Sequence, residues 1–179
     1  MKKTLLGTIV AVAFSSVVLP ASASVGTITI NGTINSTTCV ASIGAGKDAT
    51  INLNPLDASS LASATATAGY ETFTISLKDC GSATNQVNAF FEPGSTVDMA
   101  TGHLVNVAPS ATAAKNVQVQ LLNKNQQVIK VGDATTARAI KETIVDGKAE
   151  MKYGVRYYAT GAATAGALTT SVTYSIEYH

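Results

Sequence analysis

The chain ends on the sequence ALTTSVTYSIEYH, residues 167–179, in which apolar and polar side chains alternate. A β-strand places alternate side chains on opposite faces, so this pattern predicts a strand with one apolar and one polar face. The apolar set shares one parity and consists of Leu168, Val172, Tyr174, Ile176 and Tyr178. The polar set consists of Thr173, Ser175, Glu177 and His179. The segment is therefore predicted to line a buried surface on one side only.

The segment GTITINGTIN, residues 26–35, shows the same alternation far upstream. Its even positions are Gly26, Ile28, Ile30, Gly32 and Ile34, and its odd positions are threonines and asparagines. Chain ends are usually polar and frayed unless a partner surface holds them. Two interpretations follow. Either the segment is an edge strand of its own domain, or it pairs with another molecule whose fold lacks a strand.

The first 23 residues have the three parts of a secretory signal peptide. Lys2 and Lys3 form a basic start, residues 5–19 are apolar, and ASA at 21–23 is a small-residue cleavage site. The apolar run is shorter than the roughly 20 residues of a membrane span, and a retained N-terminal anchor is the alternative interpretation. Cleavage before Ser24 would leave 179 − 23 = 156 residues, which suits one domain with its own core.

Charged residues are scarce, since Asp, Glu, Lys and Arg make up 13% of the chain against about 25% in ordinary soluble domains. Without Lys2 and Lys3 the charge count changes from 12 − 11 to 10 − 11, or −1. A near-neutral surface favours neither nucleic acid nor an anionic membrane as a partner. An exterior rich in Thr, Ser, Ala and Asn fits a protein that is largely covered by copies of itself.

The chain has two cysteines, Cys39 and Cys80, and export would carry both into an oxidising compartment. A single structural disulfide is therefore predicted. It would close a loop of about 40 residues, which the chain-entropy estimate values at roughly 4 kcal/mol. A metal site would need more ligands than two cysteines and two histidines, far apart in sequence, readily supply.

Strand signals dominate the rest of the chain. They occupy residues 38–43, 49–56, 70–80, 87–94, 102–109, 116–133 and 143–161, with turns expected at 123–127 and at Asp146–Gly147. Residues 57–69 are predicted to be a loop, and no segment has the apolar stripe of an amphipathic helix. The absence of Trp argues against an antibody-type core. This pattern predicts an all-β sandwich.

Four stretches resemble the major structural pilins of chaperone–usher fimbriae, most closely the type 1-like subunits. They are GTITINGTINSTTC (26–39), SLKDC (76–80), NVQVQLLNKNQQ (116–127) and VRYYATGAATAGALTTSVTYSIEYH (155–179). The last is the most specific, because the family's chaperone-recognition strand has alternating apolar residues, a penultimate Tyr and a Gly fourteenth from the C-terminus. Tyr178 is penultimate, and Gly166 is fourteenth counted back from His179. The likeness covers essentially the whole chain after the signal peptide.

The resemblance implies an incomplete immunoglobulin-like β-sandwich that lacks its last strand and carries an N-terminal donor-strand extension. The chain would divide into a signal peptide (1–23), a donor extension (24–35) and a pilin domain (36–179). The donor residues would be Gly26, Ile28, Ile30, Gly32 and Ile34, entering a hydrophobic groove of a neighbouring copy. The receiving edge would be formed by Gly166, Leu168, Val172, Tyr174, Ile176 and Tyr178.

The resemblance also implies partners and a location. A periplasmic chaperone would lend a strand to the receiving edge, and at an outer-membrane usher the donor extension of another copy would replace it. The product would be a head-to-tail polymer, a fimbria at the bacterial cell surface that supports adhesion. Minor fimbrial subunits are a further class of partner, and nucleic acid is not one.

No catalytic or metal-binding constellation is recognisable in the sequence. Neither His103 nor His179 accompanies a nucleophile-elbow pattern, and GAGKDAT (44–50) lacks the spacing of a phosphate loop. We therefore expect neither enzymatic activity nor a cofactor. The alternative function is a minor or adaptor fimbrial subunit, or a single-domain adhesive binding module. A secreted hydrolase, the third class, would need a clustered polar site.

Overall fold

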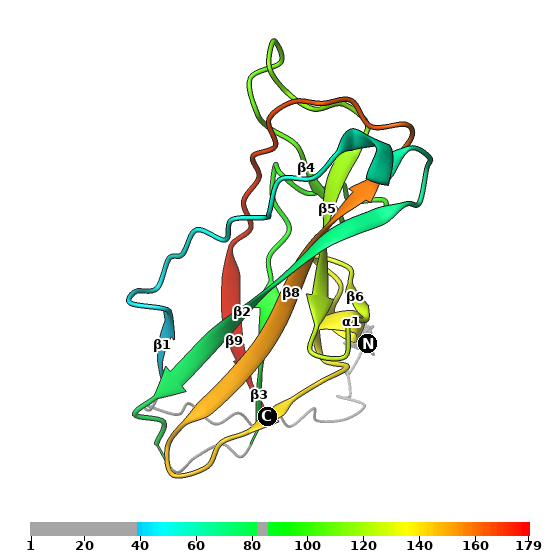
Figure 1. Ribbon diagram of the computed structural model, residues 1–179. Helices are drawn as coiled ribbons and strands as arrows, with labels where there is room; N and C mark the ends of the chain where they lie inside the picture. The colour runs from blue at the N-terminus through cyan, green and yellow to red at the C-terminus, as the bar shows by residue number, and fades with distance from the viewer. Residues whose placement is uncertain (1–38, 82–85) are drawn as a thin grey trace, which may run out of the picture. The chain divides into compact units, whose positions relative to one another are not determined.

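The computed structural model describes residues 39–81 and 86–179, whose strands form two antiparallel sheets (Figure 1). The larger sheet has the order β1-β2-β8-β5-β4, with β6 paired to β5, and the smaller sheet has the order β7-β3-β9. The strands are β1 (Val40–Ile43), β2 (Thr67–Lys78), β3 (Gln86–Phe91), β4 (Leu104–Val105), β5 (Val117–Asn123), β6 (Val128–Ile129), β7 (Glu142–Thr143), β8 (Ala149–Ala159) and β9 (Tyr174–Tyr178). The same ranges contain a 3-10 helix, η1 (Ala58–Leu61), and a one-turn helix, α1 (Ala134–Ala137).

The core lies between the two sheets and is built from alternate residues of their strands. Members no more than 2% exposed include Ile75 of β2, Met151 of β8, Leu121 of β5 and Phe91 of β3. Tyr153 of β8 packs edge-on against Phe91, with ring centroids 5.1 Å apart, and its hydroxyl accepts a 3.0 Å hydrogen bond from the Ala89 amide. Burial raises the pKa of Tyr153 to about 12. In this sandwich without tryptophan, a tyrosine is the central aromatic residue that joins the sheets.

Both predicted turns are present in the structure. Asp146 and Gly147 have φ of +50° and +70°, as the two central residues of a type I′ turn require. At 123–127, the Asn123 side-chain oxygen accepts a 2.9 Å hydrogen bond from the Asn125 amide and so closes the turn between β5 and β6. Local sequence therefore determines these two reversals of the chain.

Upstream of residue 167, the structure differs from the predicted elements mainly in three places. Residues 49–56, predicted as a strand, form none; most of their side chains are exposed, and Pro55 has no N–H to donate to a ladder. The predicted loop 57–69 contains η1, capped by Asp57, and the start of β2 at Thr67. The helix α1 was not predicted, because one turn after its N-cap Asp133 is too short to show a helical apolar period.

A relay of polar side chains lies on the outer face of the larger sheet beside β4. Asp98 accepts from the Gln118 nitrogen at 3.2 Å, and the Gln118 oxygen faces His103 Nδ1 at 3.2 Å. His103 Nε2 faces the Gln120 nitrogen at 3.1 Å, and the Gln120 oxygen accepts from Arg156 Nε at 2.8 Å.

The two ends of this relay determine the protonation of His103. A carboxylate only accepts and a guanidinium only donates, so Asp98 and Arg156 set the orientation of both glutamine amides. His103 is 7% exposed and is held neutral, with its proton on Nδ1. Burial lowers the pKa of His103 and outweighs the opposing hydrogen bond to Gln118.

We expect the free energy of unfolding to decrease as the pH falls below about 6.5, the ordinary pKa of histidine. Because the folded-state pKa of His103 is lowered, the unfolded chain binds the proton more readily. Stability is therefore full above the unfolded-state pKa and is lost as the pH falls toward the folded-state pKa. In denaturant unfolding measured above and below this pH, the free energy of unfolding of His103→Gln should depend less steeply on pH than that of the natural chain. His179→Gln is the comparison: burial lowers the pKa of His179 as well, but this residue is exposed, so its loss should remove less of the slope than the loss of buried His103. The same slope in His103→Gln as in the natural chain would contradict the relay.

Candidate functional site at the C-terminal strand

β9 lies at the edge of the smaller sheet and pairs with β3 alone among the described strands. His179 and Gln86 exchange backbone hydrogen bonds just beyond the end of this pair. In an antiparallel ladder such bonded pairs recur at every second residue. Residues 175, 177 and 179 therefore direct their N–H and C=O groups toward β3, and the even-numbered residues direct theirs to the opposite side.

The same alternation continues upstream of β9. The carbonyls of residues 167, 169, 171 and 173 all accept hydrogen bonds from neighbouring loops, at 2.6–2.9 Å. The backbone groups of Leu168, Thr170 and Val172 have no hydrogen-bond partner among the described residues. The predicted strand 167–179 is thus assigned as a strand only over Tyr174–Tyr178, because its upstream half bonds to loops. We call residues 168–178 the open edge.

The apolar side chains of the open edge pack against the core from one side. They are Leu168, Val172, Tyr174, Ile176 and Tyr178, and each is only half-buried. On the neighbouring strand β3, by contrast, Val87, Ala89 and Phe91 are no more than 2% exposed. The structure therefore brings the predicted residues together as an apolar row, interrupted by Thr170, that the described chain covers incompletely.

Two tyrosines of β9 reach across to the segment that contains β1. The Tyr178 hydroxyl accepts a 3.0 Å hydrogen bond from the Cys39 amide, and the Tyr174 hydroxyl donates a 3.1 Å hydrogen bond to the Lys47 carbonyl. Burial, together with the charge of Asp48, raises the pKa of Tyr174 and keeps its hydroxyl protonated as a donor. The edge strands β1 and β9 of the two sheets are therefore neighbours across the sandwich.

Cys39 and Cys80 form the predicted disulfide, with their Cα atoms 4.2 Å apart across 41 residues of sequence. The bond joins the residue before β1 to the chain just after β2. Because the Cys39 amide also bonds to Tyr178, the disulfide fixes the backbone against which the end of β9 rests.

Gly166 lies just before the open edge, where its backbone passes close to residues 112–114. A Cβ at this position would lie 2.6 Å from the carbonyl carbon of Ala113 and 2.7 Å from the oxygen of Thr112. Both are backbone atoms, which cannot turn aside as a side chain does. Close packing of two backbone segments therefore requires glycine here.

Asn106, which no sequence pattern singles out, joins the same region through four hydrogen bonds. Its nitrogen donates to the carbonyls of Ala114 and Ala167 at 2.9 and 2.8 Å. Its oxygen accepts from the amides of Ala108 and Thr169, both at 3.0 Å. The whole hydrogen-bonding capacity of this side chain is used to hold the segment that leads into the open edge.

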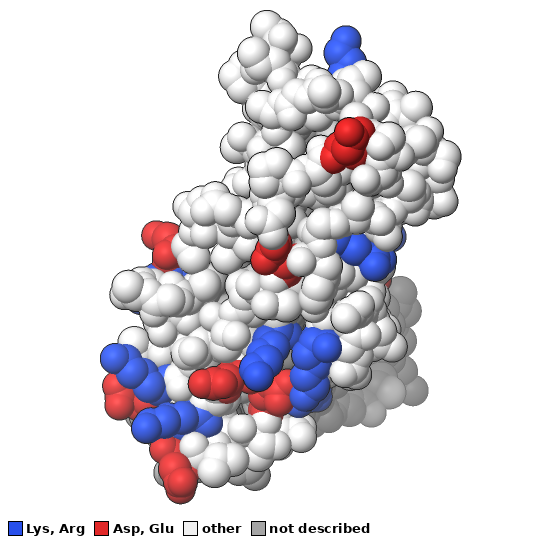
Figure 2. All heavy atoms as spheres, viewed as in Figure 1, with Lys and Arg blue, Asp and Glu red and all other residues white. Residues whose placement is uncertain are grey.

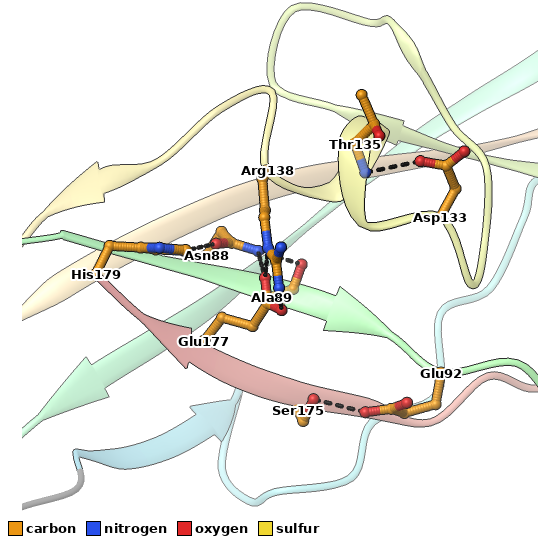
Figure 3. A network of polar contacts seen from close by, with 9 residues as sticks. All are labelled: Asn88, Ala89, Glu92, Asp133, Thr135, Arg138, Ser175, Glu177 and His179. Atoms are coloured by element: carbon orange, nitrogen blue, oxygen red, sulfur yellow. Dashed lines mark hydrogen bonds and ion pairs between the residues drawn. The ribbon is translucent and has the colours of Figure 1, made fainter. Parts of the chain in front are cut away.

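The outward face of β9 carries a second polar network (Figure 3). Arg138, at the C-cap of α1, binds Glu177 through Nε to Oε2 at 2.9 Å and Nη2 to Oε1 at 2.5 Å. Asn88 of β3 donates to Glu177 Oε2 at 2.9 Å and accepts from His179 Nε2 at 2.6 Å. The hydrogen bond from Arg138, more than that from Asn88, lowers the pKa of Glu177 to about 2. The carboxylate is thus ionised throughout the neutral and mildly acidic range.

Several predictions fall where the structure offers no test. The signal peptide and the donor residues Gly26 to Ile34 lie outside the described residues, so their roles stay predictions. Within residues 39–81 and 86–179, no three His, Cys, Asp or Glu side chains are grouped as a metal site. In those ranges there is also no helix with the length and apolar character needed to cross a membrane.

Comparison with known proteins relates this chain to fimbrial subunits. A family model described as "FimA: Type-1 fimbrial protein, A" matches residues 53–179. The major fimbrial subunit SMF-1 of Stenotrophomonas maltophilia (strain K279a) is 48% identical over 166 residues, covering 90% of this chain and 96% of that protein. The F17 fimbrial protein of Escherichia coli is 40% identical over 159 residues, covering 86% of this chain and 87% of that protein.

Solved structures show the fold. A chain from the structure of a chaperone–usher pilus aligns with a TM-score of 0.60 at 20% identity, covering 92% of this chain and 100% of that one. The P pilus rod subunit PapA aligns with a TM-score of 0.53 at 16% identity, covering 86% of this chain and 100% of that one. The predicted fold class, an immunoglobulin-like sandwich of the chaperone–usher pilin type, is thereby confirmed.

We expect Gly166→Ala to lower the free energy of unfolding by about 1–3 kcal/mol, because the added methyl group overpacks two backbone segments. Gly94→Ala is the matched control, since a Cβ at Gly94 meets no atom within 4 Å. Thermal unfolding followed by circular dichroism would compare the two variants. Equal melting temperatures would contradict the close approach at Gly166.

Proposed function

This chain belongs to the family of type-1 fimbrial proteins and is a structural subunit of a fimbria, and we propose that it polymerises by donor-strand exchange. In this proposal, residues 24–35 of one copy pair as a donor strand with the open edge of the next copy. The receiving domain comprises residues 36–179, and residues 1–23 are a signal peptide that is removed on export.

The open edge is the observation that carries this proposal. It combines backbone groups that have no partner among the described residues with a row of half-buried apolar side chains. Strand addition uses both features, since main-chain hydrogen bonds supply affinity and alternate side chains supply fit. The donor residues Gly26, Ile28, Ile30, Gly32 and Ile34 have the same two-residue period as the row they would cover. The glycines would pack where the receiving surface leaves no room for a side chain.

Contact between a donor strand and the edge of another copy is heterologous, so copies add head-to-tail without closing and a fibre results. Polymerisation with other subunits agrees with the family's role in fimbriae.

The distribution of charge on the surface also agrees with burial between subunits. Segments 106–114 and 160–171 contain no Asp, Glu, Lys or Arg, and charges are sparse at the upper end of the face in Figure 2. Uncharged loops of this kind are easily covered by a neighbouring subunit.

We propose two further partners that act before the fibre forms. A bare strand edge invites aggregation, so a periplasmic chaperone would cover the open edge after export. At the outer membrane, an usher would exchange the chaperone's strand for the donor strand of another copy. The finished fimbria at the cell surface would support adhesion, with minor fimbrial subunits as additional members.

A peptide of residues 24–35 should stabilise the chain trimmed to residues 36–179. Burying three isoleucines contributes about 1.5–3 kcal/mol each, or roughly 5–9 kcal/mol in all. At about 2–4 °C per kcal/mol this corresponds to a rise in melting temperature of roughly 10–35 °C. The trimmed chain would be refolded with the peptide, and with a control peptide carrying Ile28→Asp and Ile30→Asp. If the trimmed chain is stable alone and ignores the natural peptide, the sandwich is complete and an adhesive binding module becomes the better reading.

In the full chain, Ile30→Asp should abolish fibre assembly and leave the receiving domain folded, because a carboxylate would have to be buried in an apolar row. Thr29→Asp is the matched control, since an odd-numbered donor residue faces away from that row and should still permit assembly. Electron microscopy of cells expressing each variant would show the outcome. Normal fibres from Ile30→Asp would reject the donor assignment.

A further inference from the structure

The position of β9 depends on few contacts. Among the described strands it pairs only with β3, and its inward side chains are half-buried rather than enclosed. A strand that must accept a second partner along its other edge has to stay extended before that partner is paired. The contacts on its outward face therefore add to the backbone pairing with β3 and to the two tyrosine hydroxyl contacts in holding it in place.

Every outward side chain of β9 and of the residue after it is hydrogen-bonded (Figure 3). The Ser175 hydroxyl donates to Glu92 at 2.6 Å, and Glu177 and His179 both bond to Asn88 of β3, at 2.9 and 2.6 Å. Asn88 is 0% exposed, so the centre of this network is buried. We call Asn88, Glu177 and His179, together with Arg138, the outer network.

Arg138 is the member of the outer network that comes from outside the β3–β9 pair. Its backbone is fixed at the end of α1, where its amide donates to the Ala134 carbonyl at 3.0 Å. The start of that turn is closed by Asp133, which accepts from the Thr135 amide at 2.7 Å (Figure 3). The guanidinium thus approaches Glu177 from a rigid support and forms a two-pronged contact with the carboxylate.

A second ion pair shows what an ordinary surface contact looks like in this chain. Lys124 and Glu142 approach to 2.7 Å through a single pair of atoms. Among the described residues, no buried side chain hydrogen-bonds to the Glu142 carboxylate, whereas Glu177 also receives the hydrogen bond of buried Asn88. The two pairs are similarly exposed, with 49% and 21% for Arg138 and Glu177 against 41% and 24% for Lys124 and Glu142. What distinguishes the first is its bidentate geometry within a network, because isolated exposed pairs contribute little.

We infer that Arg138 is a positioning residue for strand exchange: it holds β9 extended on β3, so that the open edge is ready to accept a donor strand. This inference rests on the proposed function. A partner binds only the binding-competent form, so its capture weakens in proportion as that form becomes less populated. Loss of Arg138 should therefore slow donor capture by letting β9 leave its place on β3.

The test uses the full chain with Ile28→Asp and Ile30→Asp, which disable its own donor strand. A fluorescent peptide of residues 24–35 reports the rate of capture, and hydrogen exchange reports the amides of β9 and of the β2–β8 pair. We expect Arg138→Ala to slow capture about tenfold and to speed exchange in β9 but not in β2–β8. Arg138→Lys keeps the charge without the two-pronged contact. Its capture rate and its exchange rate in β9 should lie between those of the background chain and those of Arg138→Ala. Lys124→Ala should match the unmodified background in both measurements.

The possible results separate the two proposals. If the background chain fails to capture the peptide, donor-strand exchange itself is rejected. If the background captures it and Arg138→Ala captures it equally fast, the positioning role is rejected. The role is also rejected if exchange speeds up equally in β9 and β2–β8, because Arg138 would then support the fold as a whole. If Arg138→Ala fails to fold, Glu177→Gln takes its place in the test. Glutamine has the shape of glutamate without the charge, so this variant should also slow capture of the peptide.

Discussion

Among the described residues, the backbone hydrogen bonds of residues 167–179 are all made on one side, and the rest of the structure depends on this division. The odd-numbered residues bond to β3 and to the loops beyond it, while the even-numbered residues face the other way. A peptide edge and an apolar row are both costly to leave in water. The fold must therefore hold this segment extended without covering the side that an added strand would use.

The contacts that hold the segment satisfy this constraint in a consistent way. Asn106 bonds to the backbone of Ala167 and Thr169, both odd-numbered, and Gly166 lets the preceding turn pack closely. At the other end, the Tyr178 hydroxyl is bonded to Cys39, whose position the disulfide fixes. Each contact uses an odd-numbered backbone group or the tip of a side chain. None of them occupies the backbone of an even-numbered residue.

Sequence alone predicts the parts of this arrangement that repeat locally. The two-residue period assigns the faces of β9, the Asp146–Gly147 turn has its own signature, and two cysteines in an exported chain suggest one disulfide. Residues 49–56 carry a similar period but form no strand, because Pro55 cannot pair and most side chains there stay in solvent. The period shows which face is apolar, and tertiary contacts decide whether a strand forms.

The contacts that complete the site could not be predicted for a different reason. Asn106 and Ala167 are 61 residues apart, and Arg138 and Glu177 are 39 apart, so no local pattern connects them. Arg138 also follows a single helical turn, which leaves no periodic trace. Asparagine and arginine are common at protein surfaces. Only the folded chain shows that Asn106 makes its full set of hydrogen bonds and that Arg138 binds a carboxylate through two nitrogens.

The outer network also resolves an ambiguity that the apolar pattern leaves open. A slip of β9 by one residue would turn Glu177 inward and Ile176 outward, so the core already forbids it. A slip by two residues keeps every face unchanged, although it would exchange tyrosine and isoleucine positions and break the hydroxyl contacts of Tyr174 and Tyr178. It would also carry Glu177 about 7 Å along the strand, away from both Arg138 and Asn88. The charged face of β9 therefore selects, together with the two tyrosine hydroxyls, the register in which the open edge would be presented to the donor strand that we propose.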